Sequence, residues 1–305
     1  MNLLYLAKPR FGGWVSFTAH LSLKQKWKLY RITNTDEKKT RPFGYGVQYQ
    51  NIKIDSLPNN ILITAIDKNF FKYLYDIPDG SHIVIHDPTE LKKELLVHLP
   101  RFKIITIRET VQALLKDKYN LDSLFLPHPF HQYPRTIGPR SGICSISRID
   151  YDKHTDILIK ANEFLTVPID IYGAKNDLYV YRKLGDTLDP FYKGAFNKNF
   201  EELDKILSSY KYMIDMSAIK GDGAGSQYTF LEAIYHRNIL ILSKAWTSGL
   251  SSEFKHGINC LIVETAEDIN ELIDDDIDIE SILTNADSII KKHIEINWDL
   301  NLPIK

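Results

Sequence analysis

Several features that would define the class of this 305-residue chain at once are scarce or missing. Its two cysteines, Cys144 and Cys260, stand far apart in apolar runs, so we interpret them as small buried side chains in a reducing compartment rather than a disulfide framework. No CxxC or HExxH spacing and no cluster of His and Cys indicates a metal site. No apolar run approaches the roughly 20 residues that cross a bilayer, and residues 1–10 lack a signal-peptide pattern. We therefore expect a soluble, cytoplasmic protein without bound metal.

The sequence also lacks an excess of either charge. It has 38 Lys and Arg against 39 Asp and Glu, a formal net charge of −1, so no overall basic field indicates nucleic-acid binding. Several cations gather between Lys24 and Arg41; we interpret them as a solvated helix surface, with a local basic face as the alternative. The acidic run at 274–278 is expected to be a solvated turn rather than a metal site.

Short apolar runs alternate with helical patterns along the whole chain, which predicts parallel sheets covered by helices. In the first half, we expect strands at 3–7, 61–66, 82–86, 103–107 and 124–126, and helices at 69–75, 89–98 and 110–118. In the second half, we expect strands at 142–146, 169–172, 212–215, 239–242 and 260–263, and helices at 155–164, 200–209, 229–236 and 266–273.

A proline-rich stretch at 127–139 interrupts this alternation and predicts a linker, because proline cannot continue a helix or a sheet ladder. The predicted fold class is therefore α/β, with two Rossmann-like domains at residues 1–132 and 133–285. Such domains place a ligand-binding cleft between them.

A glycine-rich run, G-D-G-A-G-S at 221–226, precedes an apolar helical pattern. The backbone N–H groups of such a loop can approach an anion at a helix N-terminus, where the helix dipole favours negative charge. Glu232 is expected about two turns into that helix, within reach of the bound group. The pattern indicates a phosphorylated ligand with further hydroxyl groups, and a plain turn is the alternative.

Two cations follow the strand predicted at 142–146, at the edge where open α/β sheets bind their ligands. Arg148 offers a planar fork of donors and Lys153 a point charge, and together they can clamp a diphosphate. A pair of solvated turn cations is the alternative. Gly173 marks a second strand that runs into a glycine turn.

The order and spacing of these motifs resemble the nucleotide-binding half of GT-B glycosyltransferases, in particular the retaining group called glycosyltransferase family 4. The family's G-R-x(4–5)-K-G turn matches Arg148 and Lys153, with both glycines replaced. Its F-x-G motif matches Y-K-G at 192–194, and its L-E-A motif after a glycine-rich loop matches residues 231–233. Its D-G-x-N-G-x-L-V motif matches H-G-I-N-C-L-I-V at 256–263. These matches cover most of residues 142–273.

The resemblance implies the GT-B fold and a metal-independent hexosyl- or pentosyltransferase that uses a nucleotide-diphosphate sugar, UDP- rather than GDP-linked, without a permanently bound cofactor. Arg148 and Lys153 would neutralise the diphosphate, and Glu232 would bind the ribose hydroxyls. Other donor-binding positions that it implies are Gly12, Gly13, Gly173, Gly225, Ser226, Gln227 and Tyr228. It also implies that residues 286–305 form a last helix crossing back to the first domain, with Trp298 as a packing anchor.

One departure from the family concerns its two acids, which are separated by seven residues. Glu232 would be the second acid, whereas the first position holds Ala224. Asp222 is the candidate catalytic acid that contacts the sugar, and a loop-capping Asp is the alternative. His86 matches a histidine that lies near the transferred sugar in the family, and a satisfied histidine at a strand end is its alternative. The retaining or inverting outcome stays open.

The acceptor is also open. A compact chain rich in Lys, Asn and Ile resembles proteins of large DNA viruses and phages, some of which carry GT-B enzymes that glycosylate hydroxymethylated cytosine in DNA. The basic segments at 27–31 and 38–43 would then meet DNA phosphates in the host cytoplasm. A glycan, a lipid and a small molecule are the other acceptors, and the chain could be a monomer or a homodimer.

Two further function classes are compatible with the sequence. The missing acid at Ala224 favours a non-catalytic module that binds sugar nucleotides. An epimerase of GT-B architecture is the other, although Arg148 and Lys153 favour transfer over epimerisation.

Overall fold

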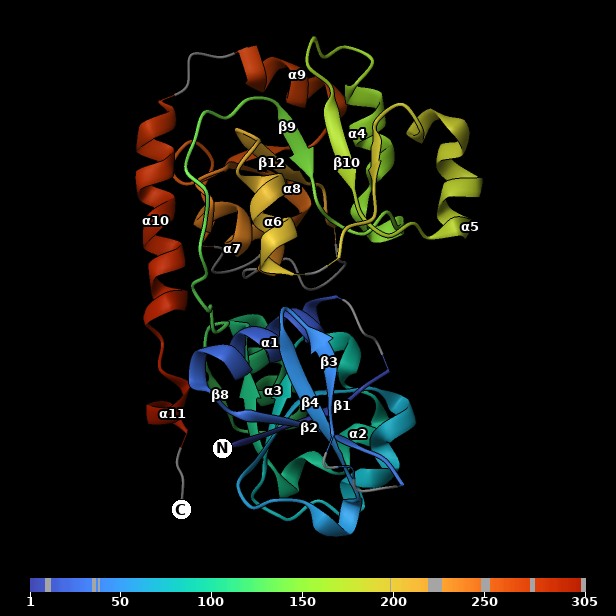
Figure 1. Ribbon diagram of the computed structural model, residues 1–305, viewed down its shortest axis with the longest axis vertical. Coiled ribbons are helices and arrows are strands. Elements are labelled where there is room, and N and C mark those ends of the chain that lie inside the picture. Colours follow the sequence, from blue (N-terminus) through green and yellow to red (C-terminus); the bar gives the residue numbers. More distant parts are fainter. Residues whose placement is uncertain are drawn as a thin grey trace. The chain divides into compact units, whose positions relative to one another are not determined.

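The computed structural model describes residues 1–8, 12–34, 37, 39–197, 199–218, 227–247, 253–274 and 278–302. The chain divides into two compact units: unit 1 comprises Met1–Gln132 with Lys292–Lys305, and unit 2 comprises Tyr133–Lys291. Each unit is built on its own sheet with helices packed against it (Figure 1). Among the described helices, none is both long and apolar enough to cross a membrane.

Unit 1 contains an 8-stranded sheet in the order β3-β4-β2-β1-β5-β6-β7-β8. Only the pairing of β3 with β4 is antiparallel among these strands. Its elements before the linker are β1 (Asn2–Leu6), α1 (Gly13–Gln25), β2 (Lys28–Ile32), β3 (Thr40–Gly44), β4 (Val47–Ile52), β5 (Ile61–Ile66), β6 (His82–Ile85), α2 (Lys93–Leu96), β7 (Lys103–Thr106), α3 (Glu109–Tyr119) and β8 (Ser123–Phe125). Every residue of β5 and β6 is buried, as in parallel sheets that are covered on both faces.

The region between Lys24 and Arg41 differs from the prediction. Helix α1 ends at Gln25, Lys26 takes a left-handed conformation with φ 57°, and the chain continues as strand β2. The interpretation of this region as a solvated helix surface was therefore wrong. Leu29 and Ile32 are buried on opposite faces of β2, while Arg31 between them is only partly buried.

Two predicted helices of unit 1 are also shorter or tighter than expected. Residues 68–75 form a 3₁₀ helix, Lys68–Tyr75. The pattern at 89–98 yields only a 3₁₀ turn, Pro88–Glu90, and the single helical turn of α2. Pro100 lies four residues beyond α2, near the start of a 3₁₀ turn, Leu99–Arg101, where the ring of proline is tolerated although it cannot stand in a helix interior.

Unit 2 contains a 6-stranded sheet in the order β11-β10-β9-β12-β13-β14, with every neighbouring pair parallel. Its elements are β9 (Ile143–Ser145), α4 (Thr155–Ala161), β10 (Ile169–Tyr172), α5 (Asp177–Tyr179), β11 (Tyr192–Gly194), α6 (Phe200–Leu207), β12 (Tyr212–Asp215), α7 (Tyr228–Tyr235), β13 (Ile239–Ser243), α8 (Lys244–Thr247), β14 (Leu261–Val263), α9 (Ala266–Asp274) and most of α10 (Ile279–Glu295). The strands predicted at 169–172 and 212–215 are confirmed residue for residue. Cys144 and Cys260 are buried and free, as predicted.

The end of the chain is part of unit 1. The indole of Trp298, in α11 (Trp298–Asn301), is fully buried, lies 5.4 Å from the ring of Phe17 and donates to the carbonyl of Pro127 at 3.1 Å. The ammonium of Lys24 donates to the carbonyl of Ile294. Trp298 is thus a packing anchor, as the sequence predicted.

Candidate functional site

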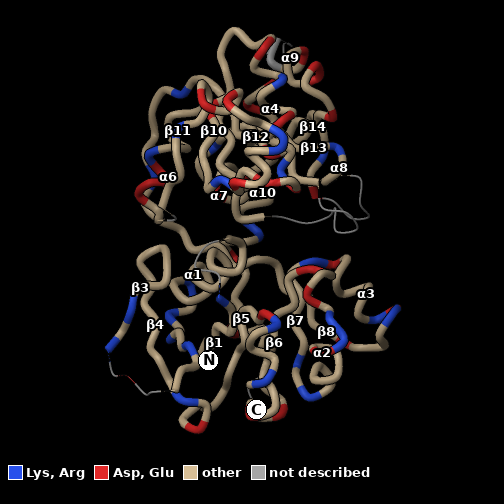
Figure 2. Tube along the Cα trace, turned by 90° about the vertical axis from the view of Figure 1, so that its right-hand side faces the viewer, with Lys and Arg blue, Asp and Glu red and all other residues tan. Residues whose placement is uncertain are grey.

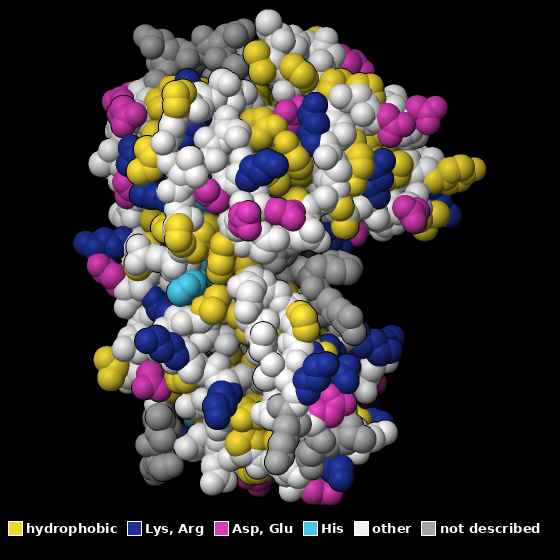
Figure 3. Space-filling model, in the orientation of Figure 1, with side chains coloured by type: hydrophobic (Ala, Val, Ile, Leu, Met, Phe, Trp, Pro, Cys, Tyr) yellow, Lys and Arg dark blue, Asp and Glu magenta, His cyan; other side chains and the backbone are white. Residues whose placement is uncertain are grey.

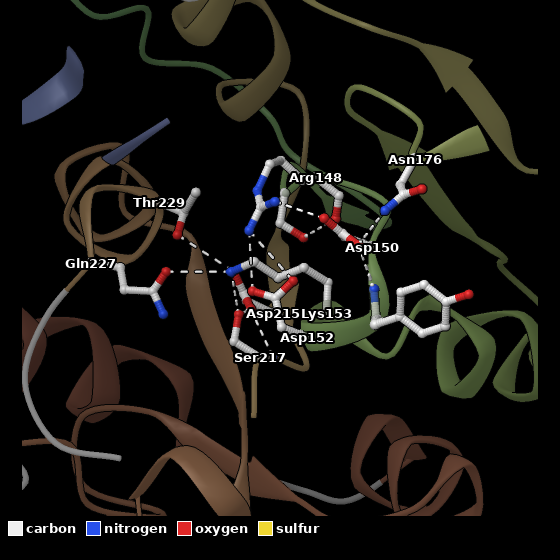
Figure 4. Close-up of polar contacts among 11 residues, drawn as sticks. Arg148, Asp150, Asp152, Lys153, Asn176, Asp215, Ser217, Gln227 and Thr229 are labelled. Atoms are coloured by element: carbon white, nitrogen blue, oxygen red, sulfur yellow. Dashed lines mark hydrogen bonds and ion pairs between the residues drawn. The ribbon is translucent and has the colours of Figure 1, made fainter. Parts of the chain in front are cut away.

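A polar cluster lies at the carboxyl ends of β9 and β12 in unit 2 (Figure 4). Because these strands are parallel, the segments that follow them emerge at the same edge of the sheet. The segment after β9 carries Arg148 and Lys153, and the segment after β12 carries Ser217. Gln227, at the start of α7, completes the cluster from a third element.

Lys153 is the buried cation of this cluster. Its side chain is 8% exposed, and its Nζ lies 3.7 Å from an Oδ2 of Asp215, which is fully buried. The same ammonium donates to the hydroxyl of Ser217 and, at 3.4 Å, to the side-chain carbonyl of Gln227. A buried ammonium needs such compensation, since desolvation of an unpaired charge is costly. Asp215 therefore supplies the opposite charge that compensates the burial of Lys153.

Arg148 is the accessible cation, with 47% of its side chain exposed. Its guanidinium pairs with Asp150 at 2.7 Å and with Asp152 at 3.2 Å. Asp150 is itself fixed, because it accepts from the amide of Asn176 at 2.8 Å and from the backbone of Tyr151 at 2.9 Å. The two cations thus sit side by side with different degrees of freedom (Figure 4).

Gly173 holds the turn that carries Arg148. Its φ is +147°, and a Cβ at this position would lie 1.9 Å from the carbonyl oxygen of Ser147. The turn is then pinned to the segment after β10 by two hydrogen bonds, from Ile149 N–H to the carbonyl of Ala174 and from Asn176 N–H to the carbonyl of Ile149. Only glycine permits this approach, so Gly173 allows the turn that carries Arg148 and Lys153 to pack directly against the segment after β10.

Helix α7 carries the predicted donor-binding residues Tyr228 and Glu232, both of them buried. The helix begins at Tyr228, so Glu232 lies about one turn into it, not two. Burial, and then the charge of Glu232, raises the pKa of Tyr228 well above its usual value. Asp222, Ala224, Gly225 and Ser226 lie outside the described residues.

The predicted residues of unit 1 meet around the start of α1. Gly12, with φ 99°, precedes the helix, and Gly13 is its first residue. The indole of Trp14 donates to the carboxyl of Glu90 at 2.7 Å, and the same carboxyl accepts from the backbone N–H of His86 at 3.0 Å. Glu90 thereby ties the end of β6 to the first turn of α1.

His86 is buried and satisfied within unit 1. Its Nε2 donates to the carbonyl of Thr64 at 2.7 Å, and its ring lies 4.8 Å from that of Phe17. Burial lowers the pKa of His86 to about 4, so the ring is neutral at neutral pH. Burial and the nearby Asp87 raise the pKa of Glu90 well above its usual value.

The residues of these clusters that the sequence did not predict include Asp215, Ser217 and Glu90. Asp215 is the last residue of a buried strand. An acid at that position could have been identified as a candidate site residue, because open α/β sheets bind their ligands at the carboxyl ends of the strands. Glu90 gave no comparable signal, since its partner Trp14 lies 76 residues away. Within the described part of the chain, no group of 3 or more His, Cys, Asp or Glu is placed to hold a metal ion.

Comparisons with known proteins place the fold. No protein-family profile matches the sequence, and no functionally curated protein matches it either. Among solved structures, HepE of Anabaena in complex with UDP-glucose is similar with a TM-score of 0.66 and 14% identity, covering 96% of this chain and 95% of that one. An alpha-glucosyltransferase in complex with UDP is similar with a TM-score of 0.64 and 14% identity, covering 98% and 97%.

Two further structures extend the comparison. The alpha-glucosyltransferase in complex with UDP and a 13-mer DNA containing a HMU base has a TM-score of 0.64 at 14% identity, covering 95% of this chain and 92% of that one. TarM of S. aureus has a TM-score of 0.58 at 16% identity, and this chain spans 52% of its length while 76% of this chain is covered. The chain therefore has the α/β fold of the GT-B glycosyltransferases.

Proposed function

We propose that the chain is a glycosyltransferase that takes its sugar from a UDP-sugar. The observation that carries this proposal is the cluster in which Arg148 and Lys153 stand at the carboxyl ends of β9 and β12. The choice of donor is supported by the similar structures, because HepE is in complex with UDP-glucose and the alpha-glucosyltransferase is in complex with UDP. A hexosyl donor and a reaction without metal are parts of the proposal.

In this proposal the two cations bind different phosphates of the donor. Arg148 would use its planar fork on one phosphate, in exchange for its contact with Asp152, while Lys153 would stay a fixed point charge against the other. Both would stabilise the UDP leaving group as the glycosidic bond breaks. Glu232 would accept hydrogen bonds from the ribose hydroxyls. Gln227 and Tyr228 would contact the donor, and roles for Gly12, Gly13, Gly225, Ser226, Asp222 and His86 stay predictions.

The acceptor proposed first is hydroxymethylated cytosine in DNA of a phage or virus, for which the glucosyltransferase bound to DNA is the supporting neighbour. A glycan, a lipid and a small molecule are the other candidates. The UDP-sugar site proposed in unit 2 is compatible with each of these acceptors.

The donor site can be tested by thermal shift with UDP, GDP and CDP, followed by hydrolysis assays with UDP-glucose and UDP-N-acetylglucosamine. We expect UDP to raise the melting temperature, because a ligand that binds only the native state adds about 2.7 kcal/mol at a hundred times its Kd. Glu232→Gln should weaken UDP binding by roughly tenfold or more, as expected for a lost hydrogen bond to a charged group.

Lys160→Ala is the matched control, since Lys160 is an exposed lysine of unit 2 that pairs with Glu267. It should leave the UDP shift unchanged. UDP binding without UDP release would identify a non-catalytic module, and a changed sugar on intact donor would identify an epimerase. Neither binding nor hydrolysis with any of these nucleotides would overturn the proposal.

A further inference from the structure

The two units carry opposite charge, although the chain as a whole is nearly neutral. Residues 1–132 with 292–305 contain 21 Lys and Arg against 14 Asp and Glu, a formal net charge of +7. Residues 133–291 contain 17 against 25, a formal net charge of −8. The segment from Lys24 to Arg41 alone holds 7 cations and 2 acids. The two opposite charges nearly cancel, so the net charge of −1 for the whole chain does not reveal that unit 1 is strongly basic.

The topology of unit 1 gathers part of this charge along one edge of its sheet. Strands β4, β2, β1 and β5 are parallel neighbours, so their carboxyl ends share an edge, and the antiparallel strand β3 starts at that edge. Each of these five strands brings a cation there, and we call the set the basic edge: Lys8, Arg31, Lys39, Arg41, Lys53 and Lys68. All but the partly buried Arg31 are exposed.

The spacing of the basic edge follows from the sheet. Four inter-strand steps of about 4.8 Å make a row roughly 19 Å wide. Figure 2 shows Lys and Arg beside β3 along the chain trace, and Figure 3 shows their side chains gathered over β3 in unit 1. One strand of duplex DNA carries a phosphate about every 3.4 Å along the axis, so a row of this width faces several phosphates at once.

Arg31 is the member of the row whose side chain is fixed by its neighbours. Its guanidinium lies over the rings of Tyr5 at 5.6 Å and Tyr49 at 5.3 Å, and it donates to the carbonyl of Ala7 at 2.7 Å. Stacking of this kind fixes the plane of the fork before a ligand arrives. Arg41 is oriented by Glu37, with Nη2 and Oε2 2.8 Å apart, on an exposed surface where such a pair is weak.

Two acids near the row, Asp67 and Glu37, are engaged in the loops of the edge. Asp67 accepts from the backbone N–H groups of Lys8 at 2.7 Å and Asn69 at 2.8 Å, where it caps the 3₁₀ helix. Glu37 accepts from Asn51 at 2.9 Å as well as from Arg41. These carboxylates order the loops of the edge, and the lysines of the row are exposed.

The surroundings of the basic edge favour a nucleic acid over a membrane. A membrane-docking surface combines cations with apolar side chains that enter the lipid. In the part of unit 1 that the structure describes, the large exposed apolar side chains lie on other elements: Tyr75, Val97, Leu124 and Leu300. An edge of cations without such side chains suits a water-soluble polyanion.

We propose that the basic edge of unit 1 binds the phosphate backbone of a nucleic acid strand and so presents a nucleotide acceptor to the enzyme. The role in presenting an acceptor rests on the proposed function, whereas the binding of nucleic acid to the basic edge can be measured without any glycosyl transfer. Since the contacts are to phosphates, binding is weakly dependent on sequence and steeply dependent on salt.

The test compares two double charge reversals by fluorescence anisotropy with a labelled DNA oligonucleotide, as a single strand and as a duplex, between about 50 and 200 mM NaCl. Lys39→Glu with Lys53→Glu changes the basic edge. Lys28→Glu with Lys118→Glu is the control, because both lysines are exposed in unit 1 but stand at the start of β2 and near the end of α3, the opposite edge of the sheet.

The basic-edge variant should weaken DNA binding at least tenfold at about 50 mM salt and lower the salt slope by about two. The control, with the same net charge, should change affinity less than twofold. Equal losses in both variants, no DNA binding by the wild type, or tighter binding to heparin or to anionic vesicles would each overturn the inference.

UDP-glucose hydrolysis is measured on the same samples and separates the two proposals. Hydrolysis that persists in a protein without DNA binding refutes only the nucleic-acid surface. DNA binding in a protein that neither binds UDP nor hydrolyses UDP-glucose refutes the proposed function and leaves the surface intact.

Discussion

The two sheets of this chain differ in how the cations at their carboxyl edges are distributed and paired. In unit 2, Arg148 is paired with two carboxylates and Lys153 with a buried third one, so the cations occupy a small, nearly neutralised cluster. In unit 1, the cations are spread along five neighbouring strands and most are exposed. A compact cluster suits a compact ligand with a few fixed charges. A row suits a long ligand with repeated charges.

The interiors differ as well. Unit 2 buries an ion pair, Lys153 with Asp215, beneath its polar edge. Unit 1 buries polar groups whose pKa values shift toward the neutral form, with His86 lowered and Glu90 raised. The comparison therefore predicts that Lys153 and Asp215 in unit 2 depend on staying paired and that His86 and Glu90 in unit 1 depend on staying uncharged.

Replacing Lys153 should have the largest effect. Lys153→Met leaves Asp215 buried without a cation, and breaking a buried pair in this way costs roughly 3–5 kcal/mol. It should also abolish the UDP thermal shift. Urea unfolding and thermal shift measure the two effects.

The double variant Lys153→Met with Asp215→Asn separates these effects. Since an uncharged replacement of a buried pair is often neutral for stability, the double variant should regain most of the stability but not the UDP response. A UDP shift that survives in either variant would remove Lys153 from the donor site.

Gly173→Ala should follow, because its Cβ would meet the carbonyl oxygen of Ser147 at 1.9 Å. We expect a loss of at least about 2 kcal/mol from strain and displacement of the turn. Gly185→Ala is the matched control, since its φ is also positive, at 53°, but no atom lies within 4 Å of the added Cβ. Urea unfolding should show about 1 kcal/mol for that control. Equal losses would mean that the close approach is unimportant.

Protonation of His86 in unit 1 should lower the free energy of unfolding by less than the Gly173→Ala substitution does, when the pH falls by one unit. The folded pKa of His86 is about 4, below the ordinary 6.5, so the unfolded chain takes up the proton first. Its contribution to stability is full above pH 6.5 and is lost as the pH falls from 6.5 toward 4, by up to about 1.4 kcal/mol per pH unit. Wild type should therefore lose more stability than His86→Asn between about pH 6 and pH 5. Identical urea midpoints at both pH values in the two proteins would contradict this.

Arg148→Ala should affect stability least. Its ion pairs are half exposed, and exposed pairs contribute less than about 1 kcal/mol. UDP affinity should nevertheless fall by roughly tenfold, as expected for the loss of a charge-assisted contact. Calorimetry against UDP and urea unfolding test this split between affinity and stability. A large loss of stability with unchanged affinity would make Arg148 structural.

Much of the fold followed from the sequence wherever burial decides the pattern. Strands such as Ile61–Ile66 and Tyr212–Asp215 are continuous buried runs, so local sequence is sufficient to identify them. Strands β2 and β3 were missed because Lys28, Arg31 and Arg41 interrupt their apolar positions, and β4 was missed although its buried residues alternate with more exposed ones. At an edge of a sheet, one face of a strand can carry charges, and the sequence then resembles an exposed helix.

The candidate site was predictable in its cations and not in their partners. Arg148 and Lys153 lie in one turn and form a local pattern. Lys153 and Ser217 are 64 residues apart, and Trp14 and Glu90 are 76 apart, so only the folded sheet brings them together. Such pairings depend on strand order, which local patterns do not contain.

The assignment of residues 292–305 to unit 1 has a consequence for biosynthesis. Trp298 fills a place beside Phe17, and Lys24 donates to the carbonyl of Ile294, so unit 1 needs both ends of this sequence. Unit 2 is a continuous segment, Tyr133–Lys291, and can fold as soon as it leaves the ribosome. The unit whose sequence is translated first is therefore completed last. During synthesis, the place beside Phe17 stays unfilled until Trp298 has emerged.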